Sequence, residues 1–349
     1  MSLPRFTFSG TSYEQGLAHG ETLKDSIEQN IDVYLNRFET EAGIGKKQLI
    51  DNAGIYLDIL REQSPEYVNG INGISESSNL DLNEIALLNL RYELLYHALG
   101  KRYLNESVDG CTAFGILPEA ADNNHLIMGQ NWDWIPEVDC VLTTSMDTDG
   151  IRRLSFTEAG IFAGKPGMNS EGIGLAVNGM YSTADDWTRF EKPFHLRCYE
   201  VLRSLNMDDS LTALAGTPRS CTANFIVGHA PKRVVDVELA PDNLRLIDPE
   251  DGVISHANHF DDPGILGVSE PPNPRRNLSE FRQKRMETLL NEQAPIDILG
   301  LQNILKDHEN HPHSLCRHRD ETLPEFQHTI TKTAMIMDLS EKKMWVTAG

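Results

Sequence analysis

The sequence changes character at one point, the tripeptide Asp109-Gly110-Cys111, and this change constrains the fold more than any other feature. Before it, apolar residues recur at helical spacing, which predicts a helical N-terminal third. The clearest stripe lies between positions 12 and 40 and consists of Leu23, Ile27, Ile31, Tyr34 and Leu35. We expect a second helix near 47–62 and a third that begins at Asp81, where Asp81 and Glu84 have capping-box spacing. The segment SESSNL, just before Asp81, is expected to be a loop.

Short β-rich runs between turn residues make up most of the chain after Gly110. They are CTAFGIL, HLIMGQNW, CVLTTSM, RRLSFTE, GIGLAVNGM, TANFIVGHA, RVVDVELA, NLRLIDP, TAMIMDLS and KMWVTA. Turn-like segments such as DTDG, NSEG and SEKK link neighbouring runs, as in antiparallel hairpins. Helical patterns interrupt the runs near 193–216 and 277–306. The order predicts an α+β fold in which helices cover antiparallel sheets.

Charge and cysteine usage limit the partners and the compartment. The net charge of −21 repels phosphate backbones and anionic membranes, so we expect neither nucleic acid nor a membrane as a partner. The five cysteines are odd in number and scattered, which favours reduced thiols over a disulfide framework. The N-terminus shows no signal-peptide pattern, and no apolar stretch is long enough to span a membrane. These observations together predict a cytoplasmic protein.

The Gly110–Cys111 bond offers a specific chemistry. A thiol beside a glycyl carbonyl can attack that carbonyl and form a thioester, and hydrolysis of the thioester leaves cysteine as a new N-terminus. Glycine has no side chain to block the attack. The product pairs a thiol with an α-amine, whose pKa values of about 8.5 and about 8 allow proton transfer between them near neutral pH. The alternative is a buried core cysteine at the start of a strand.

Several motifs follow Cys111 in a fixed order: GQNWD, then TEAG and NSEG leading to AVN, then HANH, then SLCR. With GCT, and with GTSYEQGLAHGE near the N-terminus, this order resembles the acyl-coenzyme A:6-aminopenicillanic-acid acyltransferase family of N-terminal-nucleophile cysteine hydrolases. The resemblance covers nearly the whole chain. It implies a four-layer αββα sandwich and a precursor that cleaves itself before the cysteine. The expected products are a helical pro-segment or α chain, residues 1–110, and a β chain, residues 111–349, which stay associated as one compact domain.

The same resemblance assigns the first site residues. Cys111 matches the family nucleophile. Asp133 matches an acid that lies near the nucleophile and positions it or its amine, although a strand-ending aspartate is the alternative. Asn258 matches an asparagine whose amide donates to the oxyanion of the tetrahedral intermediate, with a turn residue as the alternative. We expect His256 and His259, which flank Asn258, to be structural.

Three further residues complete the expected site. Asn178 matches an asparagine that shapes the wall of the active site. Arg317 matches an arginine that pairs with an active-site acid or with a substrate carboxylate, a use that suits its planar charged fork. The hydroxyl of Thr112 is expected to hold the amine of the nucleophile. The family pattern has a second threonine after the cysteine, and this chain has Ala113 there, which puts the hydroxyl's help in doubt.

The leading hypothesis is hydrolysis of a linear carbon–nitrogen amide bond through an acyl-enzyme on Cys111. The alternative is acyl transfer from a coenzyme A thioester to an amine, and no other cofactor is expected. A hypothesis from another functional class is that the chain is a metal-binding protein. It rests on the cluster His308, His311, His313, Cys316 and His318, whose spacing matches no standard zinc finger. We expect no metal at the catalytic site, and the sequence leaves a homo-oligomer open.

Overall fold

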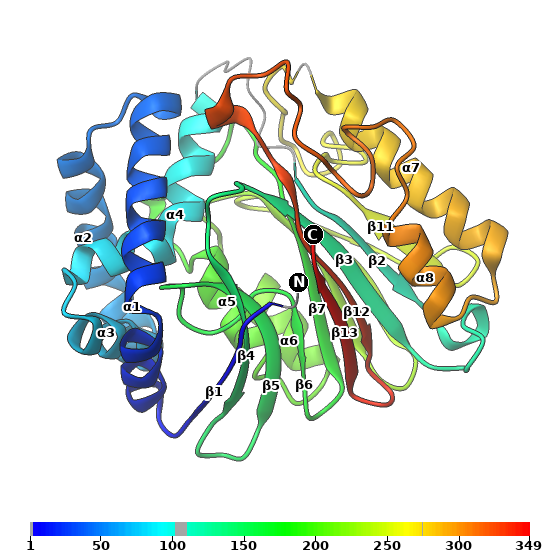
Figure 1. Cartoon of the computed structure of the whole chain (residues 1–349), viewed down its shortest axis with the longest axis horizontal. Coiled ribbons are helices and arrows are strands. Elements are labelled where there is room, and N and C mark those ends of the chain that lie inside the picture. The colour runs from blue at the N-terminus through cyan, green and yellow to red at the C-terminus, as the bar shows by residue number, and fades with distance from the viewer. Residues whose placement is uncertain (1–2, 102–109, 274) are drawn as a thin grey trace.

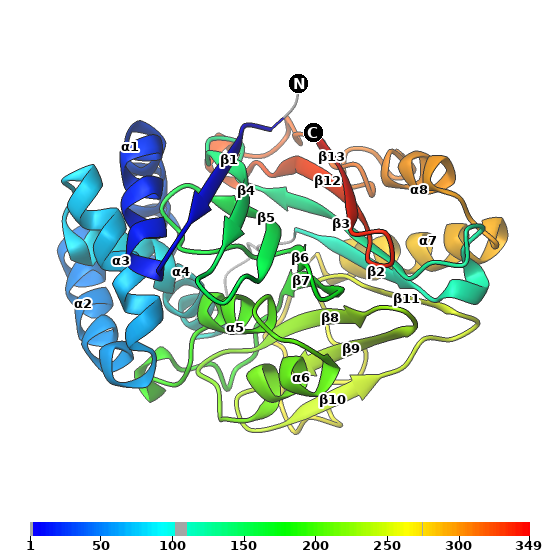
Figure 2. The same cartoon turned by 90° about the horizontal axis from the view of Figure 1, so that it is seen from below.

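Two β-sheets form the centre of the protein (Figures 1 and 2). The computed structural model describes residues 3–101, 110–273 and 275–349. The larger sheet has the order β1 (Arg5–Ser9), β4 (Cys140–Met146), β5 (Arg152–Glu158), β6 (Gly167–Asn169), β7 (Ile173–Gly179), β8 (Ala223–His229), β9 (Arg233–Leu239) and β10 (Leu244–Ile247). The smaller sheet has the order β11 (Val253–His256), β2 (Thr112–Ile116), β3 (Ile127–Trp134), β12 (Ile330–Asp338) and β13 (Lys343–Ala348).

Helices cover the outer face of each sheet, and the inner faces pack on one another. Helices α7 (Arg276–Gln293) and α8 (Ile298–Leu305) lie on the smaller sheet, and α5 (Phe194–Val201) and α6 (Met207–Ala215) lie on the larger one (Figure 2). Between the sheets, β2 and β3 contact β7. The order helix, sheet, sheet, helix is the four-layer αββα sandwich expected from the sequence. One cluster of buried apolar side chains contains residues of both sheets, such as Met128 of β3 and Ile226 of β8.

The N-terminal helices form a bundle at one side of the sandwich (Figure 1). They are α1 (Ser12–Arg37), α2 (Lys46–Gln63), α3 (Pro65–Ser78) and α4 (Leu82–Lys101). Helix α1 begins at a capping box in which the Thr11 side chain accepts from Glu14 and the Glu14 carboxylate accepts from Thr11. One cluster of buried apolar side chains joins the bundle to both sheets, for example Ile27, Leu88 and Val177. Within the described residues, no helix has the length and apolar character needed to cross a membrane.

The sequence prediction missed four elements. Helix α3 includes most of the segment SESSNL, so the predicted loop is wrong there. Its glycines explain why it is helical despite weak propensity: a Cβ on Gly73 would lie 2.4 Å from the Tyr13 carbonyl oxygen, so α1 and α3 meet backbone to backbone. Strand β1 lies inside the stretch read as helical and pairs in parallel with β4. Strands β6 and β11 are three and four residues long, too short to show a periodicity.

The predicted hairpins agree with the structure. DTDG joins β4 to β5, NSEG joins β6 to β7, and SEKK joins β12 to β13, each as an antiparallel pair. The segments near 193–216 and 277–306 contain α5 to α8 as expected. Short 3-10 turns lie at Pro118–Ala120, Trp187–Arg189 and Glu325–Gln327, and a π-helical turn at Phe38–Ala42 follows α1. Asp109, one residue of the predicted composition break, lies outside the described residues.

Candidate active site

Cys111 lies at the entrance to β2, and its backbone is strained. Its φ is +147°, a value that side-chain-bearing residues rarely adopt, at a cost on the order of 1–3 kcal/mol. The preceding Gly110 fits where no larger residue would, because a Cβ there would lie 2.6 Å from the Asp133 carbonyl oxygen. The Gly110 N–H donates to Asn258 Oδ1 at 3.1 Å. The peptide between Gly110 and Cys111 is therefore held between β3 and the Asn258 side chain.

The Cys111 thiol is buried, with 5% of the residue exposed. Burial and then the nearby Asp133 carboxylate raise the thiol pKa to about 12, because both disfavour a thiolate. The Asp133 backbone N–H donates to the sulfur, and the positive charges of Arg282 and Lys165 also act to lower the pKa. At neutral pH the thiol of the uncut chain is consequently protonated, so reaction at this sulfur needs a base.

Asp133 lies near the end of β3 and pairs with Thr331 near the start of β12, and this pairing brings polar groups to its carboxylate. Thr331 donates its hydroxyl to Asp133 Oδ1 at 2.7 Å, and Arg317 Nε lies 3.7 Å from Asp133 Oδ2. The Arg317 backbone N–H donates to Thr331 Oγ1 at 2.7 Å. The structure thus places Arg317 beside Asp133. Thr331 was not predicted, since only the register between β3 and β12 brings it to this position.

Arg282 is the main site residue that the sequence did not reveal. It is fully buried on α7, and its Nη1 donates to the Cys111 carbonyl at 2.7 Å and to Thr112 Oγ1 at 2.8 Å. Its Nη2 donates to Asn258 Oδ1 at 3.0 Å. One guanidinium therefore fixes three groups around the nucleophile. The helical spacing of Arg282 with Met286 and Leu290 was the available signal, because all three lie on the buried stripe of α7.

The two predicted asparagines make different contacts around Cys111. Asn258 donates one amide hydrogen to the Gly179 carbonyl at 3.0 Å and lines the same cavity as the nucleophile. Asn178 instead donates to the carbonyls of Cys111 at 3.2 Å and His256 at 3.3 Å. Asn178 is not among the described residues that line the cavity, and its hydrogen bonds go to the backbone of Cys111 and His256.

The remaining predicted neighbours contact protein groups. The Thr112 hydroxyl accepts from Arg282 on the α7 side of the sheet. His256 Nε2 lies 3.1 Å from Glu238 Oε1, and His259 Nδ1 lies 2.9 Å from the Ser279 hydroxyl oxygen. Both histidines are buried.

A small cavity of about 20 Å³ lies at Cys111, and this volume is too small for a substrate. Helix α4 covers it with Arg91, Tyr92 and Tyr96. The cavity is also lined by the side chains of Trp132, Asp133, Trp134, Phe194 and Asn258. The Arg91 guanidinium pairs with buried Glu158 at 2.5 Å, and the Lys165 ammonium pairs with the same carboxylate. The cavity wall is thus aromatic with one paired cation.

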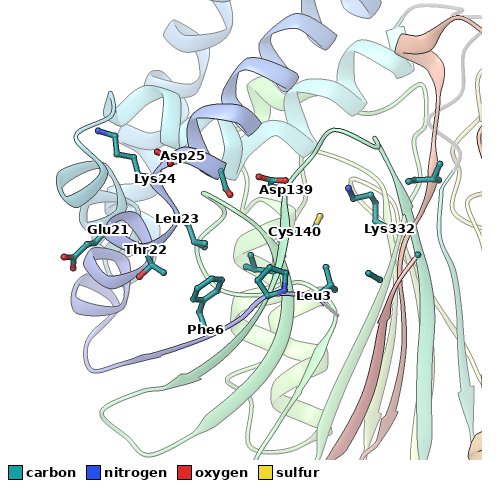
Figure 3. Close-up of a pocket in the computed structure, with 16 residues that line it drawn as sticks. Leu3, Phe6, Glu21, Thr22, Leu23, Lys24, Asp25, Asp139, Cys140 and Lys332 are labelled. Carbon is teal, nitrogen blue, oxygen red and sulfur yellow. The ribbon is translucent and has the colours of Figure 1, made fainter. Parts of the chain in front are cut away.

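A larger cavity of about 590 Å³ lies elsewhere, between the two ends of the chain (Figure 3). It is lined by residues near the N-terminus, in the middle of α1, at the start of β4 and of β12, and at the C-terminus, including Leu3, Phe6, Cys140 and Lys332. None of the predicted site residues lines it. Among the described residues, two groups of side chains have the geometry to hold a metal ion: His308 with Cys316 and His318, and Glu238 with His256 and Asp261. Neither group contains Cys111.

Comparison with known proteins identifies relatives of the chain. The model of the family described as acyl-coenzyme A:6-aminopenicillanic acid acyl-transferase matches residues 120–349. A curated relative, the 40 kDa form of acyl-coenzyme A:6-aminopenicillanic-acid acyltransferase from Emericella nidulans, is 25% identical over 319 residues, 89% of this chain and 84% of the relative.

Solved structures match at lower identity. The N-acylethanolamine-hydrolyzing acid amidase ortholog from Caenorhabditis elegans has a TM-score of 0.50 and 13% identity, over 68% of this chain and all of that one. This likeness supports the N-terminal-nucleophile hydrolase fold. A conjugated bile acid hydrolase variant from Clostridium perfringens has a TM-score of 0.49 and 12% identity, over 68% of this chain and 89% of that one. The enzyme class read from the sequence, amidohydrolase or acyltransferase with an N-terminal nucleophile, agrees with the family match. The chain belongs to the acyl-coenzyme A:6-aminopenicillanic acid acyl-transferase family.

Proposed function

We propose that the protein is a self-processing cysteine amidohydrolase that acts on linear amides. It cuts its own chain between Gly110 and Cys111, and the products 1–110 and 111–349 remain associated. The observation that carries this proposal is the strained, tightly held Gly110–Cys111 peptide among Asp133, Asn258 and Arg317. A single apolar core that spans the N-terminal helices and both sheets supports the continued association of the two products.

The first reaction is cleavage of the chain. The Cys111 sulfur attacks the Gly110 carbonyl carbon, the Gly110–Cys111 C–N bond breaks, and the α-amine takes up the thiol proton. Water then hydrolyses the resulting thioester, which restores the thiol and leaves a carboxylate on Gly110. Cleavage releases the unfavourable φ of Cys111, since its nitrogen no longer belongs to a fixed peptide. It also frees the space that Gly110 holds in the cavity wall.

The second reaction is turnover of substrate. The neutral α-amine of Cys111 takes the thiol proton as the sulfur attacks the amide carbonyl, and then gives that proton to the departing amine. The Asn258 amide has a second hydrogen for the tetrahedral oxyanion besides the one donated to Gly179. Arg282 and Asn178 keep the backbone of Cys111 in place. Water releases the acyl group as a carboxylic acid, so no metal or redox cofactor takes part in these steps.

Gly110→Ala is expected to slow self-cleavage at least about tenfold. The added methyl group meets the Asp133 carbonyl oxygen, and overpacking of this kind costs about 1–3 kcal/mol. Denaturing mass spectrometry over a time course measures the uncut fraction. Gly45→Ala is the matched control, since nothing lies within 4 Å of a Cβ there. Cleavage of Gly110→Ala at the wild-type rate would show that the close contact at Gly110 does not govern processing.

Acyl transfer is the second candidate, and it is favoured by the relative from Emericella nidulans, which is an acyl-coenzyme A:6-aminopenicillanic-acid acyltransferase. Both reactions pass through the same acyl-enzyme and differ in the acceptor, water or an amine. A coenzyme A thioester would then be the acyl donor.

The acceptor can be measured directly. Matured protein is given an N-acyl anilide or an acyl-coenzyme A thioester, with or without 6-aminopenicillanic acid as acceptor, and products are quantified by liquid chromatography. We expect free carboxylic acid as the main product in both conditions, with Cys111→Ala as the blank. A dominant acyl-amine product would identify a transferase, and absence of both products from matured protein would contradict the proposed function.

A further inference from the structure

The segment between α8 and β12 brings three potential metal ligands together. His308 Nε2 and His318 Nε2 lie 2.9 Å apart, and Cys316 Sγ lies 4.0 Å from His318 Nε2. All three ligand atoms lie within 4.8 Å of one another. We call these three residues the His–Cys cluster. The cluster lies at the surface, far from Cys111 in the sequence. The described residues that line the cavity at Cys111 include none of the three.

Backbone hydrogen bonds hold this segment in a defined shape. The Cys316 N–H donates to the Asp307 carbonyl, and the His318 N–H donates to the Pro312 carbonyl, each at 3.0 Å. Below the segment, Asn131 of β3 donates to the carbonyls of Leu305 at 2.9 Å and Leu315 at 2.8 Å. The ligand atoms therefore meet because the loop is built that way, although sequence spacing alone does not reveal it.

The geometry and chemistry of the cluster fit a borderline-soft divalent ion. With metal–nitrogen bonds of about 2.0–2.1 Å and a metal–sulfur bond of about 2.3 Å, a tetrahedral ion needs roughly 3.3 Å between nitrogens and roughly 3.6 Å between nitrogen and sulfur. The observed 2.9 and 4.0 Å differ from these values by about half an ångström or less. Imidazole and thiolate ligands suit zinc and its neighbours, whereas magnesium and calcium prefer oxygen.

We propose that the His–Cys cluster binds a divalent transition-metal ion of the zinc class. His311, whose ring centroid lies 5.0 Å from that of His318, is positioned to supply the fourth ligand, and water is the other source. His313, the remaining histidine of the segment, does not belong to the site, because its Nε2 lies 3.1 Å from the Asp320 carboxylate.

The ion would fix the segment that presents Arg317 to the active site. Arg317 stands between two cluster residues, and its backbone and side chain contact Thr331 and approach Asp133. This is a structural role beside an enzyme, unlike the metal-binding protein considered from the sequence alone. The proposed ion takes no part in the reaction at Cys111, so the metal site and the proposed function stand or fall separately.

Cobalt binding tests the site with a readout that is independent of activity. A processed chain carries an N-terminal aminothiol at Cys111 that itself chelates metals, so the full-length Cys111→Ala protein is titrated first and the wild type in parallel. We expect one Co²⁺ per chain, with the near-ultraviolet thiolate-to-cobalt absorption of a sulfur ligand. Competition by Zn²⁺ should abolish the signal, and Zn²⁺ should raise the Tm of the same protein.

Single substitutions connect the signal to the cluster. In the Cys111→Ala background, Cys316→Ser should remove the thiolate absorption, and His318→Ala should weaken Co²⁺ binding at least about tenfold. His313→Ala is the matched control in the same loop and should bind like the parent. Circular dichroism checks that each variant is folded, and His308→Ala replaces any variant that is not. No stoichiometric cobalt binding by the folded parent, or equal binding by the Cys316 and His318 variants, would overturn the proposal.

Discussion

Cys111→Ala is expected to leave one uncut chain of 39.1 kDa in which amide hydrolysis is undetectable. Without the sulfur, neither the Gly110 carbonyl nor a substrate carbonyl can be attacked, and no acyl-enzyme forms. Denaturing mass spectrometry compares the variant with the wild type, which should separate into the products 1–110 and 111–349. Release of amine from an N-acyl anilide gives the activity of the same samples.

Cys140→Ala is the matched control for this result. Cys140 is buried to nearly the same degree as Cys111, and burial likewise raises the pKa of its thiol to about 12. It lines the larger cavity rather than the one at Cys111, so its variant should split and turn over substrate like the wild type (Figure 3). A wild-type chain that stays whole and still hydrolyses amides would refute the mechanism with a free α-amine.

Asn258→Ala is expected to lower kcat by a factor of about 10²–10³, with a much smaller change in KM. The amide donates to an oxyanion that exists only in the transition state and the tetrahedral intermediate, so its loss raises the barrier without weakening substrate binding equally. Kinetics are measured on the processed fraction, quantified by the amount of new N-terminal cysteine. This correction is needed because Asn258 also accepts from Gly110 and Arg282, so the variant should cut itself more slowly.

The control for that measurement is Asn243→Ala. Asn243 also donates its amide to a backbone carbonyl, that of Leu266 at 3.0 Å, but it lies outside the cavity at Cys111. The Asn243→Ala variant should keep kcat within about twofold of the wild-type value, since the substituted side chain contacts no reacting atom. An Asn258→Ala enzyme that keeps wild-type kcat after full processing would exclude Asn258 as the oxyanion donor and leave that role to a backbone N–H.

Much of the secondary structure was predictable because its signals are local. Periodic apolar residues reveal α1, α2 and α4, and turn residues reveal the hairpins from β4 to β13. Helix α3 and strand β1 were missed for opposite reasons. Helix α3 contains glycines and serines of low helix propensity, and close packing on α1 overrides that preference. Strand β1 is stabilised by β4, a partner far along the chain that no local pattern reveals.

The sequence alone determined the nucleophile candidate and its partners by motif, because Cys111, Asp133, Asn258 and Arg317 stand in segments with recognisable order. Only the tertiary structure decided what supports them. Arg282 looks like any arginine of a charged helix until α7 packs on β2, and the ligands of the His–Cys cluster meet only after the loop has folded on β3. The physical reason is that periodicity and turn chemistry act between near neighbours. Contacts between a buried cation, a carbonyl and a carboxylate from distant segments exist only once sheet register and helix packing bring them together.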